Sequence, residues 1–259
     1  MRRNRKGRVV IILSLVALMM AYVVFSSVFR GKDLQTSIDK NEKSLPIHSV
    51  DTQNKEVALS FDVNWAEKEY LYDILNILDK YNIKATFFVM GKWLSFSDEN
   101  AEKLKKIKEG GHEIGNHSYL HPNFSRISNE KIEEEVKKTD ELIEGIIGEK
   151  TKLFRFPSGD YNERAAKKIY ELGYMPIQWD ADSVDWKEDG ESVEYERVKK
   201  KIKNGSITLF HNNAKHTPKN LERLIKELQS EGYEFKKIGD MIYKEDFNID
   251  SSGIQHKNL

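Results

Sequence analysis

Two histidines four residues apart are the side chains of this sequence with the clearest capacity for chemistry. His117 and His121 enclose Ser118-Tyr119-Leu120 and follow a short strand-like run. Side chains at i and i+4 lie on the same face of a helical turn, so such a turn would point both imidazoles the same way. Two neutral imidazoles side by side form half of a site for a divalent metal such as zinc. The spacing alone is weak evidence, because it also arises by chance.

Further polar side chains stand at the ends of predicted strands. Strands are expected at 57–62, 85–90, 112–116, 153–155, 174–179 and 206–210, and helices at 67–81, 98–109, 128–147, 162–172, 193–203 and 217–231, where Thr217 would be the N-cap. In parallel β/α folds the functional groups collect where strands end. The groups that this rule brings together are Asp62, His117, Arg155, Asp180 and His211.

The repeated strand-then-helix order predicts an α/β fold with a parallel sheet or barrel. About six or seven such units are present, fewer than the eight of a standard barrel. We therefore expect a distorted or incomplete (β/α) barrel over residues 55–244, preceded by a polar stalk at 31–54 and followed by a polar C-terminal tail at 245–259.

The N-terminus has the features of a membrane anchor. The run from Val9 to Phe29 contains no charged residue, and it is long enough to cross a hydrocarbon core of about 30 Å. The basic residues before it predict a cytoplasmic tail within residues 1–30 and an extracytoplasmic domain beyond. The run is longer than a signal-peptide core and ends without a good cleavage site. These features favour an uncleaved, single-pass transmembrane helix in the cell membrane over a cleaved signal peptide.

The charge and cysteine content exclude several function classes. The first thirty residues hold six basic and no acidic side chains, which leaves 36 basic and 42 acidic ones in residues 31–259, a net charge of −6. A mildly acidic body argues against a nucleic-acid partner, since phosphate binding needs a basic face. The absence of cysteine excludes disulfide scaffolds, thiolate-bound zinc and thiol catalysis. Nothing in the composition predicts the oligomeric state.

Five short motifs in order resemble the polysaccharide deacetylase family, also called the NodB-homology domain or carbohydrate esterase family 4. They lie between Lys55 and Tyr243 and read Ser60-Phe61-Asp62-Val63-Asn64, His117-Ser118-Tyr119-Leu120-His121, Arg155-Phe156-Pro157-Ser158-Gly159, Asp182-Ser183-Val184-Asp185-Trp186 and Leu209-Phe210-His211. Each motif is loose, but five in this order are a specific signal. The resemblance implies metal-dependent hydrolysis of an N-acetyl group on an amino sugar.

The resemblance also implies a role for each motif residue. A divalent metal, most often zinc, would be bound by His117 and His121. Asp62 would be the general base and His211 the general acid. Asp185 would orient His211, and Arg155 would hold Asp62 by a charge-assisted contact. A backbone N–H near Ser158 would stabilise the oxyanion, while Trp186 and Leu209 would line the pocket for the acetyl methyl group.

One position departs from the family pattern. The second aspartate of the first motif is the third protein ligand of the metal in the family, and Val63 stands there in this chain. Val63-Asn64-Trp65 resembles a sporulation-associated branch of the family. Three outcomes remain open: Asn64 or Asp160 supplies the missing ligand, Asp62 moves onto the metal at the cost of the base, or the site is metal-poor.

The sequence leaves three functions open. The first is a membrane-anchored deacetylase that acts outside the cell on peptidoglycan or a chitin-like glycan. The second, motivated by Val63, is a metal-poor, sugar-binding pseudoenzyme at the cell wall. The third is an amidase for a small metabolite, which the outward orientation disfavours.

Overall fold

The computed structural model describes residues 44–258. The predicted cytoplasmic tail, the predicted transmembrane helix and most of the predicted stalk lie outside these residues. Within the described part, no helix combines the length and the apolar character that a membrane span requires.

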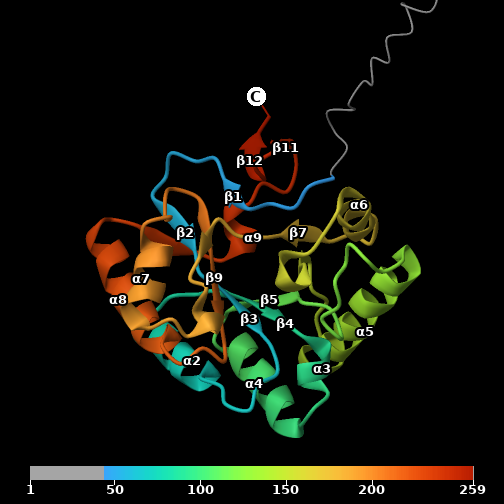
Figure 1. The fold of residues 1–259 in the computed structure, drawn as a ribbon, viewed down its shortest axis with the longest axis horizontal. Helices are drawn as coiled ribbons and strands as arrows, with labels where there is room; N and C mark the ends of the chain where they lie inside the picture. Colours follow the sequence, from blue (N-terminus) through green and yellow to red (C-terminus); the bar gives the residue numbers. More distant parts are fainter. Residues whose placement is uncertain (1–43, 259) are drawn as a thin grey trace, which may run out of the picture. The chain divides into compact units, whose positions relative to one another are not determined.

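A single curled sheet forms the centre of the domain (Figure 1). Its main path runs β11-β12-β1-β9-β3-β4-β5-β6-β7, while β2 and β8 pair with β9, and β10 pairs with β2. The strands are β1 (Ser49–Val50), β2 (Glu56–Ala58), β3 (Ser60–Val63), β4 (Thr86–Val89), β5 (Glu113–Asn116), β6 (Leu153–Arg155), β7 (Met175–Ile177), β8 (Ala181–Asp182), β9 (Ser206–His211), β10 (Glu234–Lys236), β11 (Phe247–Ile249) and β12 (Ile254–Lys257).

The path from β9 through β3, β4, β5 and β6 to β7 is parallel throughout. At the far edge, β7 meets the N-terminal segment through one bridge between Ile47 and Ile177. The next residues of that segment form β1, which is antiparallel to β9. The sheet thus curls back towards its first strand through a single bridge, and the prediction of a distorted or incomplete barrel is confirmed.

Helices cover the outer face of the sheet (Figure 1). They are α2 (Leu71–Lys80), α3 (Gly91–Leu94), α4 (Asp98–Glu109), α5 (Asn129–Ile147), α6 (Glu163–Glu171), α7 (Glu191–Lys199), α8 (Thr217–Ser230) and α9 (Ile238–Met241), with 3-10 turns η1 (Pro157–Gly159) and η2 (Asp185–Lys187). Ser97 caps α4, and Ser128 caps α5, by accepting a backbone N–H with its hydroxyl. The Ser97 cap explains why α4 begins at the predicted residue.

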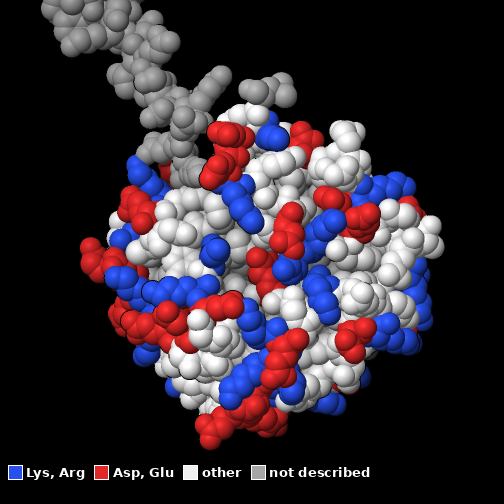
Figure 2. All heavy atoms as spheres, turned by 180° about the vertical axis from the view of Figure 1, so that it is seen from behind, with Lys and Arg blue, Asp and Glu red and all other residues white. Residues whose placement is uncertain are grey.

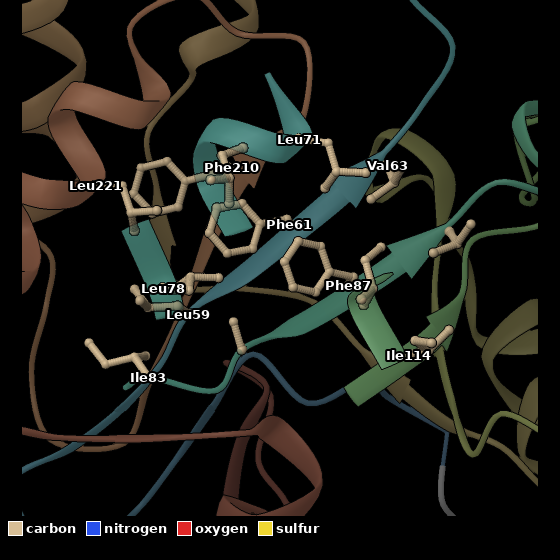
Figure 3. Packing of buried hydrophobic residues seen from close by; sticks show 14 of the residues in the cluster. Leu59, Phe61, Val63, Leu71, Leu78, Ile83, Phe87, Ile114, Phe210 and Leu221 are labelled. Atoms are coloured by element: carbon tan, nitrogen blue, oxygen red, sulfur yellow. The ribbon is translucent and has the colours of Figure 1, made fainter. Parts of the chain in front are cut away.

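The alternation of side chains along β3 separates the core from the polar interior. Leu59, Phe61 and Val63 pack in the largest hydrophobic cluster with residues of α2, α4, α7 and α8 (Figure 3). Successive side chains of a strand point to opposite faces, so Ser60 and Asp62 lie on the other face. The same strand therefore contributes to the hydrophobic core and positions a carboxylate.

The domain extends beyond the predicted limits at both ends. The predicted stalk contains Ile47 and β1, which belong to the sheet, and the predicted polar tail contains β11 and β12. Strand β12 pairs in parallel with β1, and the buried Gln255 side chain exchanges two hydrogen bonds with the backbone of Tyr243. These short strands lack a strong apolar pattern and are stabilised by long-range pairing, which explains why the sequence did not reveal them.

The surface carries charges of both signs in close mixture. Figure 2 shows Lys and Arg side chains interspersed with Asp and Glu over one face of the domain. Many of these charges form helix-surface pairs, such as Lys105 with Glu102 and Lys106 with Glu109. Exposed pairs of this kind contribute little to stability, in the range of about 0–1 kcal/mol each.

Candidate active site

The catalytic candidates converge where the parallel strands end. Asp62 at the end of β3 and His211 at the end of β9 are direct partners in the register of the two strands. Arg155, the last residue of β6, reaches Asp62 with its guanidinium. The arrangement places a carboxylate and an imidazole side by side, which is a geometry that serves acid–base catalysis.

A fully buried arginine holds the carboxylate in place. Arg155 donates from Nη1 to Oδ1 of Asp62 at 3.0 Å, and from Nη2 to Oγ of Ser60 at 2.8 Å and to the carbonyl of Gln178 at 3.1 Å. Its guanidinium also lies over the Phe88 ring, 4.0 Å from the centroid. A buried charge of this kind needs a partner, and Asp62 supplies it.

Opposing effects set the ionisation of Asp62. Burial would raise its pKa, but the neighbouring His117 and Arg155 outweigh burial and hold the pKa of Asp62 below its ordinary value. Asp62 is therefore ionised at neutral pH, the state that a general base requires.

The two motif imidazoles come from an irregular loop rather than from a helical turn, which corrects the expectation from their spacing. Ser118 and His121 both adopt left-handed backbone conformations, with φ of 61° and 60°. The buried carboxylate of Glu135 on α5 fixes the loop by accepting the backbone N–H groups of Tyr119 and Leu120 at 3.0 and 2.6 Å. The imidazoles still meet, with ring centroids 5.0 Å apart.

The hydrogen bonds of His117 define which nitrogen is free. Nδ1 lies 3.0 Å from the carbonyl of Arg155, which only accepts, so Nδ1 carries the proton. Burial lowers the pKa of His117 to about 4, so the ring is neutral at pH 7. Nε2 is then an acceptor; it is buried without a hydrogen-bond partner within residues 44–258 and lies 3.4 Å from Oδ2 of Asp62. Two acceptors that face each other fit a cation between them.

Residues 44–258 nevertheless offer no third ligand for a catalytic zinc. Val63 is buried in the hydrophobic cluster and offers no lone pair. Asp160 accepts hydrogen bonds from the backbone and the hydroxyl of Ser125, while Oδ1 of Asn64 is buried without a partner in the described chain. Among residues 44–258, no three His, Asp or Glu side chains form a group that could hold a metal ion. The residues present therefore do not fit a three-ligand centre that also keeps Asp62 free as a base.

On the acid side of the site, which comprises His211 and its partners, hydrogen bonds link the imidazole to Asp185 and Asp185 to Thr217. Nδ1 of His211 lies 2.7 Å from Oδ1 of the buried Asp185, whose Oδ2 accepts the backbone N–H of His211 at 2.9 Å and the hydroxyl of Thr217 at 2.5 Å. Burial lowers the pKa of His211, but the hydrogen bond and charge of Asp185 outweigh it, so the pKa is raised above its ordinary value. The protonated form is thereby favoured, as a general acid requires.

The remaining predicted site residues differ in their surroundings. Ser158 is exposed and left-handed, with φ of 53°, Trp186 is 60% exposed and Leu209 is buried. Asp180, which the sequence places at a strand end, is bound elsewhere: its carboxylate accepts from Ser206 Oγ and from the backbone of Ile207 at the beginning of β9. Asp180 is therefore a structural residue at the opposite end of that strand.

Four residues that the sequence did not single out form hydrogen bonds with site residues or with the loops that hold them. They are Ser60, Glu135, Asn212 and Thr217. Thr217 is not the N-cap of α8, because that position is His216 and the Thr217 hydroxyl bonds Asp185 instead. Their signals are weak in a single sequence, since a hydroxyl or carboxylate on a helix ordinarily indicates a cap or a solvated face.

Comparison with known proteins defines the family. The polysaccharide deacetylase family model matches residues 49–177. The peptidoglycan-N-acetylmuramic acid deacetylase PdaA of Bacillus subtilis is 30% identical over 225 residues, which cover 85% of this chain and 83% of that protein. The chain belongs to the polysaccharide deacetylase family, within carbohydrate esterase family 4.

Solved structures of the family include proteins described as pseudoenzymes. The structure of BA3943 from Bacillus anthracis, described as a family 4 pseudoenzyme, superposes with a TM-score of 0.72 at 32% identity and covers 83% of this chain and 74% of that one. A mutant of the same protein, described as having restored enzymatic activity, gives 0.71 at 35% identity and covers 76% and 71%. The relatives thus include both named deacetylases and a named pseudoenzyme.

Proposed function

We propose that this protein removes N-acetyl groups from amino sugars of peptidoglycan or of a chitin-like glycan. The observation that carries the proposal is the register pairing of Asp62 with His211, each held by its own buried partner. The names of curated relatives, which include a peptidoglycan deacetylase, support the substrate class.

In the proposed reaction, Asp62 accepts a proton from the attacking water and His211 gives a proton to the leaving nitrogen. Arg155 keeps the carboxylate oriented and Asp185 keeps the imidazole oriented and protonated. A backbone N–H near the exposed Ser158 stabilises the oxyanion, and Trp186 with Leu209 contacts the acetyl methyl group. His117 and His121 would hold a divalent cation only weakly, because Val63 contributes no ligand; such a cation would supply Lewis-acid polarisation of the acetyl carbonyl.

The proposed location is outside the cell, at the membrane. It is supported by the uncharged run from Val9 to Phe29 with basic residues before it. An extracytoplasmic domain on a membrane anchor would meet its glycan substrate in the cell wall.

Acetate release from hexa-N-acetylchitohexaose and from peptidoglycan tests this proposal. We expect Asp62→Asn and His211→Gln each to lower the rate by about 100-fold or more, since each removes an acid–base group. His256→Gln is the matched control, because His256 lies on β12 and contacts Asp51 and Asp250. Equal rates in Asp62→Asn and wild type would contradict the proposed chemistry.

A second function, a glycan-binding pseudoenzyme, is favoured by one specific observation. Val63 is buried in the hydrophobic cluster where the family has a ligand, and a protein of similar structure is described as a pseudoenzyme. This function predicts binding of the hexaose without acetate release at any concentration of added zinc, cobalt or manganese. Calorimetry together with the acetate assay separates it from the hydrolase.

A further inference from the structure

A fully buried asparagine follows His211 and forms hydrogen bonds with four other residues. The backbone N–H of Asn212 donates to the carbonyl of Asp62 at 3.2 Å, and its carbonyl accepts the backbone N–H of Tyr70 at 2.7 Å. The first of these bonds extends the pairing of β9 with β3 by one residue. Asn212 therefore joins the strand of the proposed general acid to the strand of the proposed base.

The side chain of Asn212 binds the backbone just beyond the end of β3. Its Oδ1 accepts the N–H of Asn64 at 3.0 Å, and its Nδ2 donates to the carbonyl of Asn64 at 3.1 Å. One side-chain amide thereby satisfies both backbone groups of a residue that lies outside the strand. The backbone two residues after Asp62 is thus fixed to the residue that follows His211.

The same side chain also holds the far end of the loop 64–70. Nδ2 of Asn212 donates to Oε2 of Glu69 at 2.8 Å. Glu69 in turn accepts the indole N–H of Trp93 on α3 at 3.2 Å and forms an ion pair with Lys103 on α4. Both ends of the loop are therefore bonded to Asn212, and loss of this side chain would leave several polar groups without their partner.

We infer that Asn212 is a positioning residue, which fixes the spacing between the carboxylate of Asp62 and the imidazole of His211. The inference rests on the proposed function and adds to it a buried residue that acts through these two groups. Proton transfer at one acetamide requires the base and the acid to lie within hydrogen-bond reach of the reacting atoms. An error of about 1 Å in such a spacing can lower a rate by about 100-fold.

The chain offers a second amide with the same bonding pattern away from the site. Gln255 on β12 is also fully buried; its Oε1 accepts the N–H of Tyr243 at 2.9 Å, and its Nε2 donates to the carbonyl of Tyr243 at 2.6 Å. Strand β12 pairs with β1, which pairs with Ser206 at the beginning of β9, the end opposite to His211. Gln255→Ala is therefore the matched control, because it removes the same kind of bond pair far from the reacting groups.

The experiment measures acetate release from hexa-N-acetylchitohexaose by the full chain, at a temperature where every variant is folded. We expect Asn212→Ala to lower kcat by about 10- to 100-fold and to change KM by less than about threefold, because the reacting groups are misplaced while sugar binding is retained. Gln255→Ala should keep kcat within about twofold of wild type. Hydrogen exchange of the Asn64 amide should be faster in Asn212→Ala alone, since only that variant removes its acceptor.

A second pair of variants keeps the test decisive if Asn212→Ala does not fold. Asn212→Asp retains the acceptor for the Asn64 N–H but places a carboxylate against that of Glu69. Adding Glu69→Gln removes this repulsion and supplies an amide donor. The double variant should therefore have a higher kcat than Asn212→Asp alone, and equal kcat values would overturn the positioning role.

The outcomes separate this inference from the proposed function. A wild-type kcat in folded Asn212→Ala, with faster exchange of the Asn64 amide, overturns the positioning role and leaves the deacetylase proposal standing. Equal losses of kcat in Asn212→Ala and Gln255→Ala assign both amides to general stability and also overturn the inference. A wild-type chain that releases no acetate overturns the proposed function and the inference together.

Discussion

The two halves of the candidate site differ in how completely the chain satisfies its own polar groups. On the acid side, the carboxylate of Asp185 bonds His211 through both oxygens and also accepts from Thr217. On the imidazole side, Nε2 of His117 and Oδ1 of Asn64 are buried without partners within residues 44–258. The acid half is thus preorganised by hydrogen bonds within the protein, whereas the imidazole half keeps two buried polar atoms without partners in the described part of the chain.

The largest effect is expected at Arg155, the buried partner of Asp62. Arg155→Met keeps much of the side-chain volume but leaves the Asp62 carboxylate buried without its cation. We expect a loss of about 3–5 kcal/mol in the free energy of unfolding, measured by urea denaturation. Lys106→Met is the control, because the Lys106–Glu109 pair is exposed and its loss should leave the urea midpoint nearly unchanged. Equal losses in the two variants would show that the buried pair is not a special contact.

The next effect concerns the support of the imidazole loop. Glu135→Gln removes the charge that accepts the N–H groups of Tyr119 and Leu120. The free energy of unfolding should fall by about 1–3 kcal/mol, and the two amides should exchange with solvent faster. Glu141→Gln, on the exposed face of the same helix, should change stability by less than about 0.5 kcal/mol. Unchanged amide exchange in Glu135→Gln would exclude this supporting role.

A carboxylate at position 63 should give the imidazole half the third metal ligand that it lacks among the described residues. Val63→Asp is expected to tighten zinc binding by about tenfold or more in calorimetry, because a third ligand adds a bond and a neutralising charge. Without metal the variant should melt lower than wild type, since a polar group enters the hydrophobic cluster, and zinc should reverse part of that loss.

Val63→Thr is the matched control for that variant, with a similar shape and no carboxylate. A zinc affinity of Val63→Asp that equals the affinity of Val63→Thr would show that this position serves only the hydrophobic core.

The smallest effect is a change in titration on the acid side. Asp185→Asn removes the charge that raises the pKa of His211 and leaves the burial that lowers it, so the pKa should fall below the ordinary histidine value of 6.5. NMR titration of the imidazole measures this change. The raised pKa of His211 means that its protonated form stabilises the folded state. The free energy of unfolding of the wild type should therefore exceed that of the variant most at pH below 6.5. The difference should shrink as the pH rises through the folded pKa of His211. A pKa that stays above 6.5 in the variant would contradict the role of Asp185.

The predictability of the fold varied with the range of the interactions involved. Helix α4 and strand β6 match their predicted bounds, because a capping serine and a compact apolar run act locally. The short strands β1, β11 and β12 were missed, because they depend on partners far away in the sequence. The left-handed residues of the imidazole loop were missed for a related reason, since Glu135 of a later helix stabilises that conformation.

The sequence by itself determined the class of fold, the family and the positions of the polar groups at the strand ends, because apolar periodicity and short motifs are local properties of the chain. Only the tertiary structure decided that Asp62 and His211 are neighbours, that Asp180 is bound at the beginning of β9 and away from His211, and that Val63 is buried in the hydrophobic cluster. Those facts depend on which strands pair and on which face each residue lies, and both are fixed by packing across the whole domain.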